Sequence, residues 1–148
     1  MRRLSRLTVM ALMLLAGPLS AGAANAVDAS RILLVAHPGV DTHQLKRDTT
    51  RAIFAMRQRT WPDGQAVRVY VLDNHHPVHT RFAKEQLSVY PHQLQLAWDR
   101  MVFSGTGQAP NRVRDQAEMR ERIATTPGAL GYLEREYLDA RIQVISME

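Results

Sequence analysis

The sequence predicts an α/β fold with one mixed sheet of four to five strands flanked by helices. Three observations lead to this prediction. The 148 residues suit a single domain, and the apolar run from Ile32 to Ala36 is typical of a strand covered on both faces. A one-sided apolar stripe between Pro91 and Phe103 is typical of a helix packed on a core. A doubly covered strand needs helices on both sides of its sheet.

The N-terminal segment has the pattern of a cleaved secretory signal peptide. Its arginines precede an apolar run from Leu7 to Leu15, and small residues follow between Ala21 and Ala26. A membrane anchor is the weaker interpretation, because the run is well short of the roughly 20 apolar residues that a bilayer requires. We therefore expect a signal peptide at residues 1–26, a domain at residues 27–148 and a periplasmic location.

Charge and cysteine content exclude several classes of function. The chain has 19 Lys and Arg residues against 14 acidic ones, and three of its arginines lie in the predicted signal peptide. The remaining domain carries a net charge of only about +2, so no nucleic-acid partner is expected. No cysteine is present, which excludes disulfides, thiol chemistry and thiolate metal sites. No arrangement of nucleophile, base and orienting residue is visible, so the sequence predicts neither an enzyme nor a cofactor.

The first half of the domain is expected to contain a helix, a turn and a second strand after the first one. Asp48 to Met56 is predicted to be helical, with a capping aspartate and apolar residues on one face. Trp61-Pro62-Asp63-Gly64 is a turn signal, because proline presets one backbone angle and glycine relaxes another. The alternation from Val67 to Val71 predicts a strand with one buried face. Together these elements form a βαβ-like unit.

The second half is expected to be mostly helical. Thr80 to Leu87 is a predicted helix with Phe82 directed inward. In the following helix the apolar positions have helical spacing, and Gly105 just past its end suits a left-handed cap. These apolar positions are Leu94, Trp98, Met101 and Val102. Trp61 and Trp98 are interpreted as core or turn anchors and not as stacking platforms.

The C-terminal part completes the predicted sheet. Asp115 with Glu118 three residues later is a capping pair for another helix. Pro127-Gly128 then turns the chain into a short apolar run that ends at Leu133. The apolar residues between Ile142 and Ile145 predict a last strand. From Pro91 to Leu133 the predicted order is thus helix, loop, helix, turn and strand.

Several of these motifs together carry a resemblance to a known family. Their order and spacing resemble the small secreted phosphate-binding-protein-like group, which looks like one lobe of the periplasmic phosphate-binding component of the phosphate ABC transporter. The motifs are Ile53-Phe54, Trp61-x-Asp63-Gly64, Phe82 to Leu87, Trp98 to Phe103-Ser104-Gly105, and Pro127-Gly128-Ala129-Leu130-Gly131-Tyr132. The resemblance implies a single-lobe class 2 periplasmic-binding-protein-like fold, a noncatalytic protein, and oxyanion recognition in the full-length relatives.

The sequence departs from this family where the relatives hold phosphate. The resemblance implies an arginine and a Ser-Gly-Thr loop that opens a helix and donates backbone N–H groups to the anion. The matching place here reads His79-Thr80-Arg81-Phe82, without that loop. We expect Thr80 and Arg81 to open the helix and to bind an anion weakly together with His79. Ser104-Gly105-Thr106 follows a helix instead of opening one, so it is interpreted as a C-cap.

Two functional hypotheses follow from the sequence. The first is a solute-binding-like protein that recognises phosphate or a related oxyanion weakly, as an accessory to ABC-type transport or sensing. A single lobe leaves its ligand half covered, since this class encloses ligands between two lobes. The second is a ligand-free interaction module that contacts a membrane sensor or envelope protein. A metal site at His75, His76 and His79 is the weaker interpretation of these histidines, because no fixed carboxylate accompanies them.

Overall fold

The computed structural model describes Gly22, Ala26 and residues 28–148 of the chain. The predicted signal peptide at residues 1–26 therefore lies, apart from two residues, outside the described part. None of the helices that the structure describes combines the length and the apolar character needed to cross a membrane.

One six-stranded mixed sheet forms the centre of the molecule, in the order β2-β6-β1-β5-β3-β4. The strands are β1 (Ile32–Ala36), β2 (Gln44–Leu45), β3 (Arg68–Val71), β4 (Asn111–Arg112), β5 (Ala129–Glu134) and β6 (Gln143–Met147). β1 runs antiparallel to both of its neighbours, β5 and β6. β2 pairs in parallel with β6, and β3 pairs in parallel with both β4 and β5. The expectation of four to five strands was too low, because β2 and β4 contribute only two residues each.

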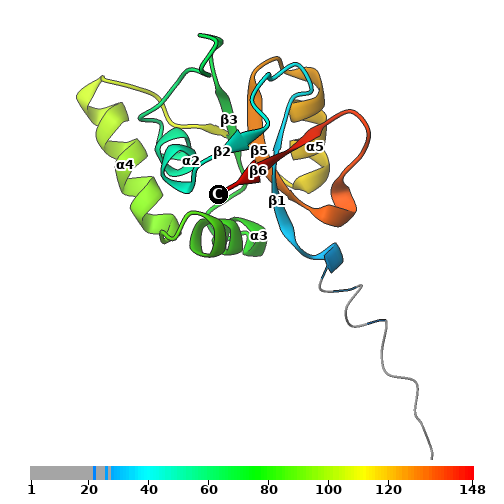
Figure 1. Cartoon of the computed structure of the whole chain (residues 1–148). Helices are drawn as coiled ribbons and strands as arrows, with labels where there is room; N and C mark the ends of the chain where they lie inside the picture. The colour runs from blue at the N-terminus through cyan, green and yellow to red at the C-terminus, as the bar shows by residue number, and fades with distance from the viewer. Residues whose placement is uncertain (1–21, 23–25, 27) are drawn as a thin grey trace, which may run out of the picture.

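Helices cover both faces of this sheet, as Figure 1 shows. The helical elements are α2 (Arg47–Phe54), α3 (Pro77–Arg81), the π-helix η1 (Phe82–Gln86), α4 (Pro91–Ser104), α5 (Gln116–Thr125) and the 3-10 helix η2 (Arg135–Tyr137). α2, α3 and α4 lie on one side of the sheet and α5 lies on the other. The predicted α/β fold with flanking helices is confirmed.

The first two long strands are both buried, but they are not neighbours. Val35 and Ala36 of β1 are fully buried, which confirms a strand covered on both faces. The prediction of one exposed face for the strand after the turn was wrong, because Tyr70 faces α5 and its hydroxyl donates a hydrogen bond to Thr126. β5 lies between β1 and β3 and runs antiparallel to β1 but parallel to β3, so β1 and β3 run in opposite directions and the predicted βαβ-like unit is also wrong. β5 is more than 50 residues further along the chain, and local patterns do not reveal its position.

Aromatic side chains join the helices to the sheet. The rings of Phe82 and Tyr132 stack with centroids 4.1 Å apart, and Phe54 meets Phe82 edge-on at 4.9 Å. Trp98 of α4 is buried, and its indole N–H donates to the Phe54 carbonyl at 2.8 Å. Trp61 is buried too, with its indole N–H on the Gly128 carbonyl at 3.1 Å. Both tryptophans are core anchors, as predicted.

Two of the glycines that carry the resemblance lie where a side chain would be strained or crowded. Gly105 caps α4 in the left-handed conformation with φ of 70°, as predicted. A Cβ on Gly131 would lie 2.7 Å from side-chain atoms of both Met119 and Ile123, so glycine lets α5 approach β5 closely. The predicted inner stripe of α4 is right for Leu94 and Trp98 but wrong for Val102, which is 51% exposed.

Candidate functional site

The polar residues that follow β3 form the candidate site, next to the start of α3. β3, β4 and β5 run in parallel, so their carboxyl ends lie at one edge of the sheet. Ligands of open α/β sheets bind at this edge. Asp73 and Asn74 follow β3 after Leu72, and Arg112 is the last residue of β4. This edge of the sheet is therefore the candidate position for an anion site.

The helix at this edge begins earlier than the sequence suggested. α3 starts at Pro77, so the prediction that Thr80 and Arg81 open it is wrong. His76 is the N-cap, and its Nδ1 accepts a hydrogen bond from the Val78 N–H at 3.2 Å. Pro77 in the first turn has no N–H to donate. The start of α3 is thus capped by its own chain, which leaves few backbone donors for an anion.

His79 lies in the core and not in a binding loop. Its ring is fully buried, and its Nδ1 is hydrogen-bonded to the Tyr132 hydroxyl. That hydroxyl accepts the Leu72 N–H at 2.9 Å, so its proton is available for Nδ1 of His79. Burial, with the nearby Arg112 charge, lowers the pKa of His79 to about 4. His79 is therefore neutral at pH 7 and supplies no positive charge to an anion.

Arg81 is occupied by interactions within the protein. It is the last residue of α3, and its guanidinium lies 3.4 Å from carboxylate oxygens of both Glu85 and Glu134. It also donates to the Ser30 carbonyl at 3.2 Å. Thr80 uses its backbone N–H in the helix, on the His76 carbonyl. The structure therefore does not bring His79, Thr80 and Arg81 together as an anion site.

Arg112 is the cation at this edge that the sequence did not single out. Its side chain is 49% exposed and lies 3.8 Å from Asp73 and 3.3 Å from Gln95. The His75 N–H and, less strongly, Arg112 lower the pKa of the Asp73 carboxyl. The parallel pairing of β3 with β4 places Arg112 here, opposite Val71. A two-residue strand carries no periodic signal, so sequence reasoning had no means to find it.

Two buried polar atoms at this edge have no hydrogen-bond partner within the described part of the protein. They are Nε2 of His79 and Oδ1 of Asn74. The amide nitrogen of Asn74 donates to Gln95 of α4 at 2.8 Å. A buried polar atom without a partner costs free energy, so these atoms indicate where a small polar species fits.

The histidines do not form a metal site. His79 is in the core and Nδ1 of His76 caps α3. No group of three or more His, Cys, Asp or Glu residues with the spacing of a metal site occurs among the described residues. Ser104 and Gly105 end α4, so this segment is a helix C-terminus as interpreted from the sequence.

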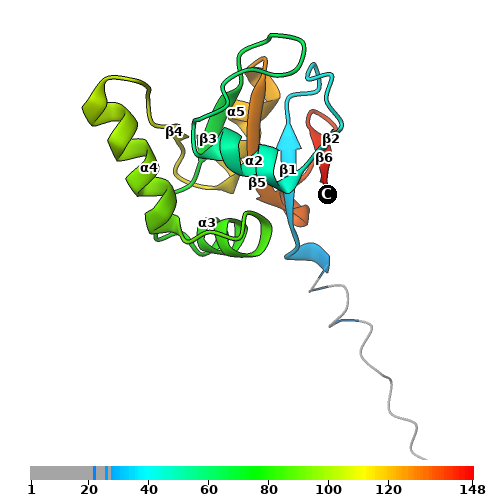
Figure 2. The ribbon, with the colours of Figure 1, turned by 60° about the vertical axis from the view of Figure 1, so that its left-hand side comes forward.

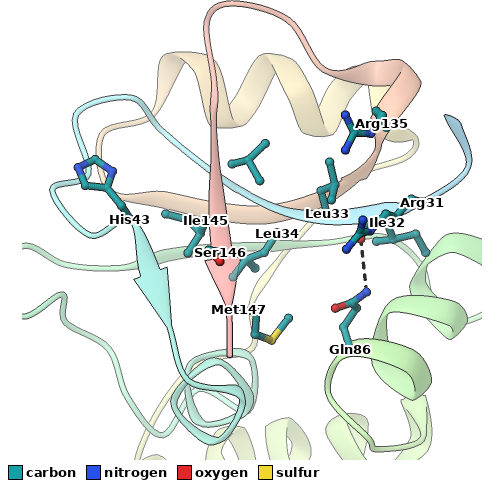
Figure 3. Close-up of a pocket in the computed structure, with 11 residues that line it drawn as sticks. Arg31, Ile32, Leu33, Leu34, His43, Gln86, Arg135, Ile145, Ser146 and Met147 are labelled. Carbon is teal, nitrogen blue, oxygen red and sulfur yellow. Dashed lines mark hydrogen bonds between the residues drawn. The ribbon is translucent and has the colours of Figure 1, made fainter. Parts of the chain in front are cut away.

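A separate pocket of about 330 Å³ lies where β1 and β6 diverge (Figure 3). The ladder between these strands stops at Leu34 and Ile145, although both strands continue. Gln86 of η1 reaches into the gap and donates to the Ile32 carbonyl at 3.4 Å. Arg31 and Arg135 lie at the rim. The pocket is polar and open, and because Gln86 already donates to the Ile32 carbonyl, that carbonyl does not need a ligand as a partner.

Comparison with known proteins identifies the fold. No protein-family model and no curated protein matches this chain. Three solved structures are similar: an ABC-type phosphate transport receptor from Vibrio cholerae (TM-score 0.60), PstS from Borrelia burgdorferi (0.61), and a Clostridium perfringens protein described as a phosphate ABC transporter substrate-binding protein with bound phosphate (0.64). Each is 12% identical to this chain.

The similarity covers most of this chain but less than half of each solved structure. It spans 78–79% of the residues here, and 45%, 47% and 44% of the Vibrio, Borrelia and Clostridium chains. The expected single-lobe periplasmic-binding-protein-like fold is thereby confirmed. At this identity the similarity establishes the fold alone, and the ligands of these proteins are not transferred by it.

Proposed function

We propose that this protein acts in the periplasm as a solute-binding-like module that works through contact with another protein, as an accessory to ABC-type transport or sensing. It is a noncatalytic protein that does not hold phosphate tightly. The periplasmic location rests on the signal-peptide pattern of residues 1–26 and on the kind of protein with which the fold is shared. The contacted partner is a membrane transporter, a sensor or an envelope protein.

The observation that carries this proposal is the closed start of α3. A helix N-terminus binds an anion through free N–H groups, and here proline and a histidine cap use up that capacity. The neutral His79 and the paired Arg81 add no free charge. The protein thus has the fold of phosphate-binding proteins without the free N–H groups and positive charges that tight phosphate binding needs.

The test is an NMR titration of the 148-residue chain with phosphate and with sulfate. We expect no localised shifts of backbone amide signals at millimolar anion, where a binding protein with an intact site would be saturated. Arg112→Ala serves as the control, and its spectrum should respond to phosphate in the same way as that of the wild type. Saturable shifts at micromolar phosphate would contradict the proposal.

The second candidate function is weak oxyanion recognition at the same edge of the sheet. One observation favours it: the half-exposed Arg112 lies beside a region that contains two unpaired buried polar atoms. A single cation with few backbone donors gives a dissociation constant on the order of 0.1 mM or weaker. This function predicts saturable shifts at Asp73 to His79 that Arg112→Ala abolishes.

A further inference from the structure

We propose that the groove between α2 and α4 binds an acidic amphipathic helix of a partner protein. This inference rests on the proposed function, in which the protein works through contact with another protein, and it names the surface and the chemistry of that contact. The groove is lined by residues at the end of α2, just after it and along α4, and Figure 2 shows these two helices on the same side of the sheet.

The floor of the groove is apolar. It encloses about 360 Å³ between the end of α2 and the length of α4. Side chains from both helices and from the segment before α4 line it, namely Ala55, Val89, Leu94, Ala97 and Met101. Short residues at Ala55 and Ala97 keep the groove open along α4. A concave apolar surface of this kind receives apolar side chains that project from a partner.

The rim of the groove is positively charged. Arg51, Arg57 and Arg100 surround the floor, and Gln93 is the remaining polar residue that lines it. Arg51 is held in place by the Leu87 carbonyl at 2.7 Å and by Asp48 at 3.1 Å. Arg57 and Arg100 are exposed, and within the described residues no ion pair or hydrogen bond of their side chains occurs. Asp48 neutralises Arg51, and no acidic residue of the described chain lines the groove, so Arg57 and Arg100 give it the charge that complements an acidic partner.

Exposed apolar residues extend the surface along α4. Leu96 is 54% exposed and Phe103 is 88% exposed, seven residues apart on the helix. Arg100 lies four residues after Leu96 and three before Phe103, so all three share the outer face of α4. In Figures 1 and 2 this helix forms the outer side of the molecule. Large apolar side chains that bracket an arginine at solvent are typical of contact surfaces.

A partner helix fits these features better than a second copy of the chain or a membrane. The acidic residues of α5 are already paired, Glu118 with Arg114 and Glu121 with Arg141, so a second copy presents no free acidic helix there. A bilayer is flat and cannot fill a groove with projecting side chains. A helix with Leu on one face and Glu beside it satisfies both the floor and the rim.

The experiment uses a synthetic Leu/Glu amphipathic peptide of about 18 residues, five helical turns, titrated into the 148-residue chain and followed by NMR. We expect amide shifts at Ala55, Arg57 and residues 93–103. Arg57→Glu and Arg100→Glu should each weaken binding at least about tenfold, because each replaces an attraction by a repulsion. Arg68→Glu is the matched control, since Arg68 is exposed on β3 away from the groove, and it should bind as the wild type does.

Further measurements distinguish a partner helix from a membrane or a second copy of the chain. Phe103→Ser changes an exposed side chain, so it tests the apolar part of the surface separately from the arginines. It should weaken peptide binding without lowering thermal stability. Equal binding of a Leu/Lys peptide, or unchanged binding by both arginine variants, would overturn the proposal.

Two other results would assign the surface to a different partner. If the chain binds phosphatidylglycerol vesicles but no peptide, and Arg100→Glu abolishes that binding, the surface contacts a membrane. If the chain forms a concentration-dependent dimer that Phe103→Ser dissociates, the surface contacts a second copy. Tight phosphate binding would refute the proposed function, but peptide binding at this groove could still be measured. Failure of the proposed function can therefore be distinguished from failure of the groove proposal.

Discussion

The ring of His79 packs among aromatic side chains in the core. Its centroid lies 5.8 Å from that of Tyr132 and 6.5 Å from that of Trp98. Burial is the main cause of its lowered pKa of about 4, and the positive charges of Arg112 and His76 lower it further, against the opposing effect of Asp73. The unfolded chain binds a proton at this residue near pH 6.5, whereas the folded chain does not.

This difference predicts an acid-sensitive fold. Because the folded-state pKa is the lower one, the stability that neutral His79 provides is fully present above about pH 6.5 and is lost as the pH falls toward 4. The loss reaches about 3 kcal/mol at most. Urea unfolding of the wild type between about pH 7.5 and 5 should show a falling free energy of unfolding.

Two variants separate His79 from the other histidines in this measurement. His79→Gln should remove most of the slope between about pH 6.5 and 5, a window above the range in which carboxylates titrate. His92 is exposed, and its ring stacks on Tyr90, so His92→Gln should leave the pH slope of the free energy of unfolding unchanged. A His79→Gln protein with the slope of the wild type would show that another group is responsible.

Glycine turns set how the elements of the sheet are joined. Gly128 precedes β5 with φ of 78°, and a Cβ there would collide with the carbonyl oxygen of Ala66. Gly64 in the turn after Trp61 has φ of 89°, and nothing lies within 4 Å of a Cβ at this position. The two glycines share the unusual backbone conformation and differ in the space around it.

Alanine at these two positions should therefore have unequal effects. Gly64→Ala is expected to lower the free energy of unfolding by about 1–2 kcal/mol, the cost of left-handed backbone for a residue with a Cβ. Gly128→Ala should cost at least about 1 kcal/mol more, because β5 must also move away from Ala66. Chemical denaturation of both variants measures the difference, and equal losses would show that the Gly128 turn relaxes freely.

Elements with local signals were predictable and long-range pairings were not. Asp115 caps α5 by accepting the Glu118 N–H at 2.8 Å, and the spacing of these residues predicted it. Gly105 likewise marked the end of α4. The place of β5 between β1 and β3 depends on residues far apart in the chain, and so does the position of Arg112 beside Asp73. The partners of His79 and Arg81 on β5, Tyr132 and Glu134, are long-range contacts of the same kind, and the sequence pattern around these two residues did not reveal them.

At the scale of the whole molecule, Glu134 at the end of β5 connects both helical layers. One of its carboxylate oxygens faces Arg81 of α3 at 3.4 Å, and the other accepts the Gln116 side-chain amide of α5 at 2.9 Å. Gln116 in turn accepts the Glu134 N–H at 2.7 Å. Because this carboxylate is partly buried and has partners on both sides of the sheet, removing one partner should cost more than breaking a surface ion pair.

Removing Arg81 should weaken this connection. Arg81→Ala is expected to lower the free energy of unfolding by about 1 kcal/mol, since Glu134 and the Ser30 carbonyl both lose a donor. The loss should shrink in a Glu134→Gln background, and urea denaturation of the four proteins measures the coupling. Arg68→Ala, at an exposed arginine of β3, should change stability by about 0.5 kcal/mol or less. Additive effects of Arg81→Ala and Glu134→Gln would show that the ion pair carries no energy.

The central position of β1 has a consequence for the order of folding. Leu34 of β1 pairs with Tyr132 on one side and with Ile145 on the other, about 100 residues later in the chain. Such a high contact order makes folding slow, because the entropy of closing a long loop is lost before the strand gains any partner. β1 is thus synthesised about 100 residues before the strands that pair with it, and we expect it to stay unpaired until β5 and β6 have both been made.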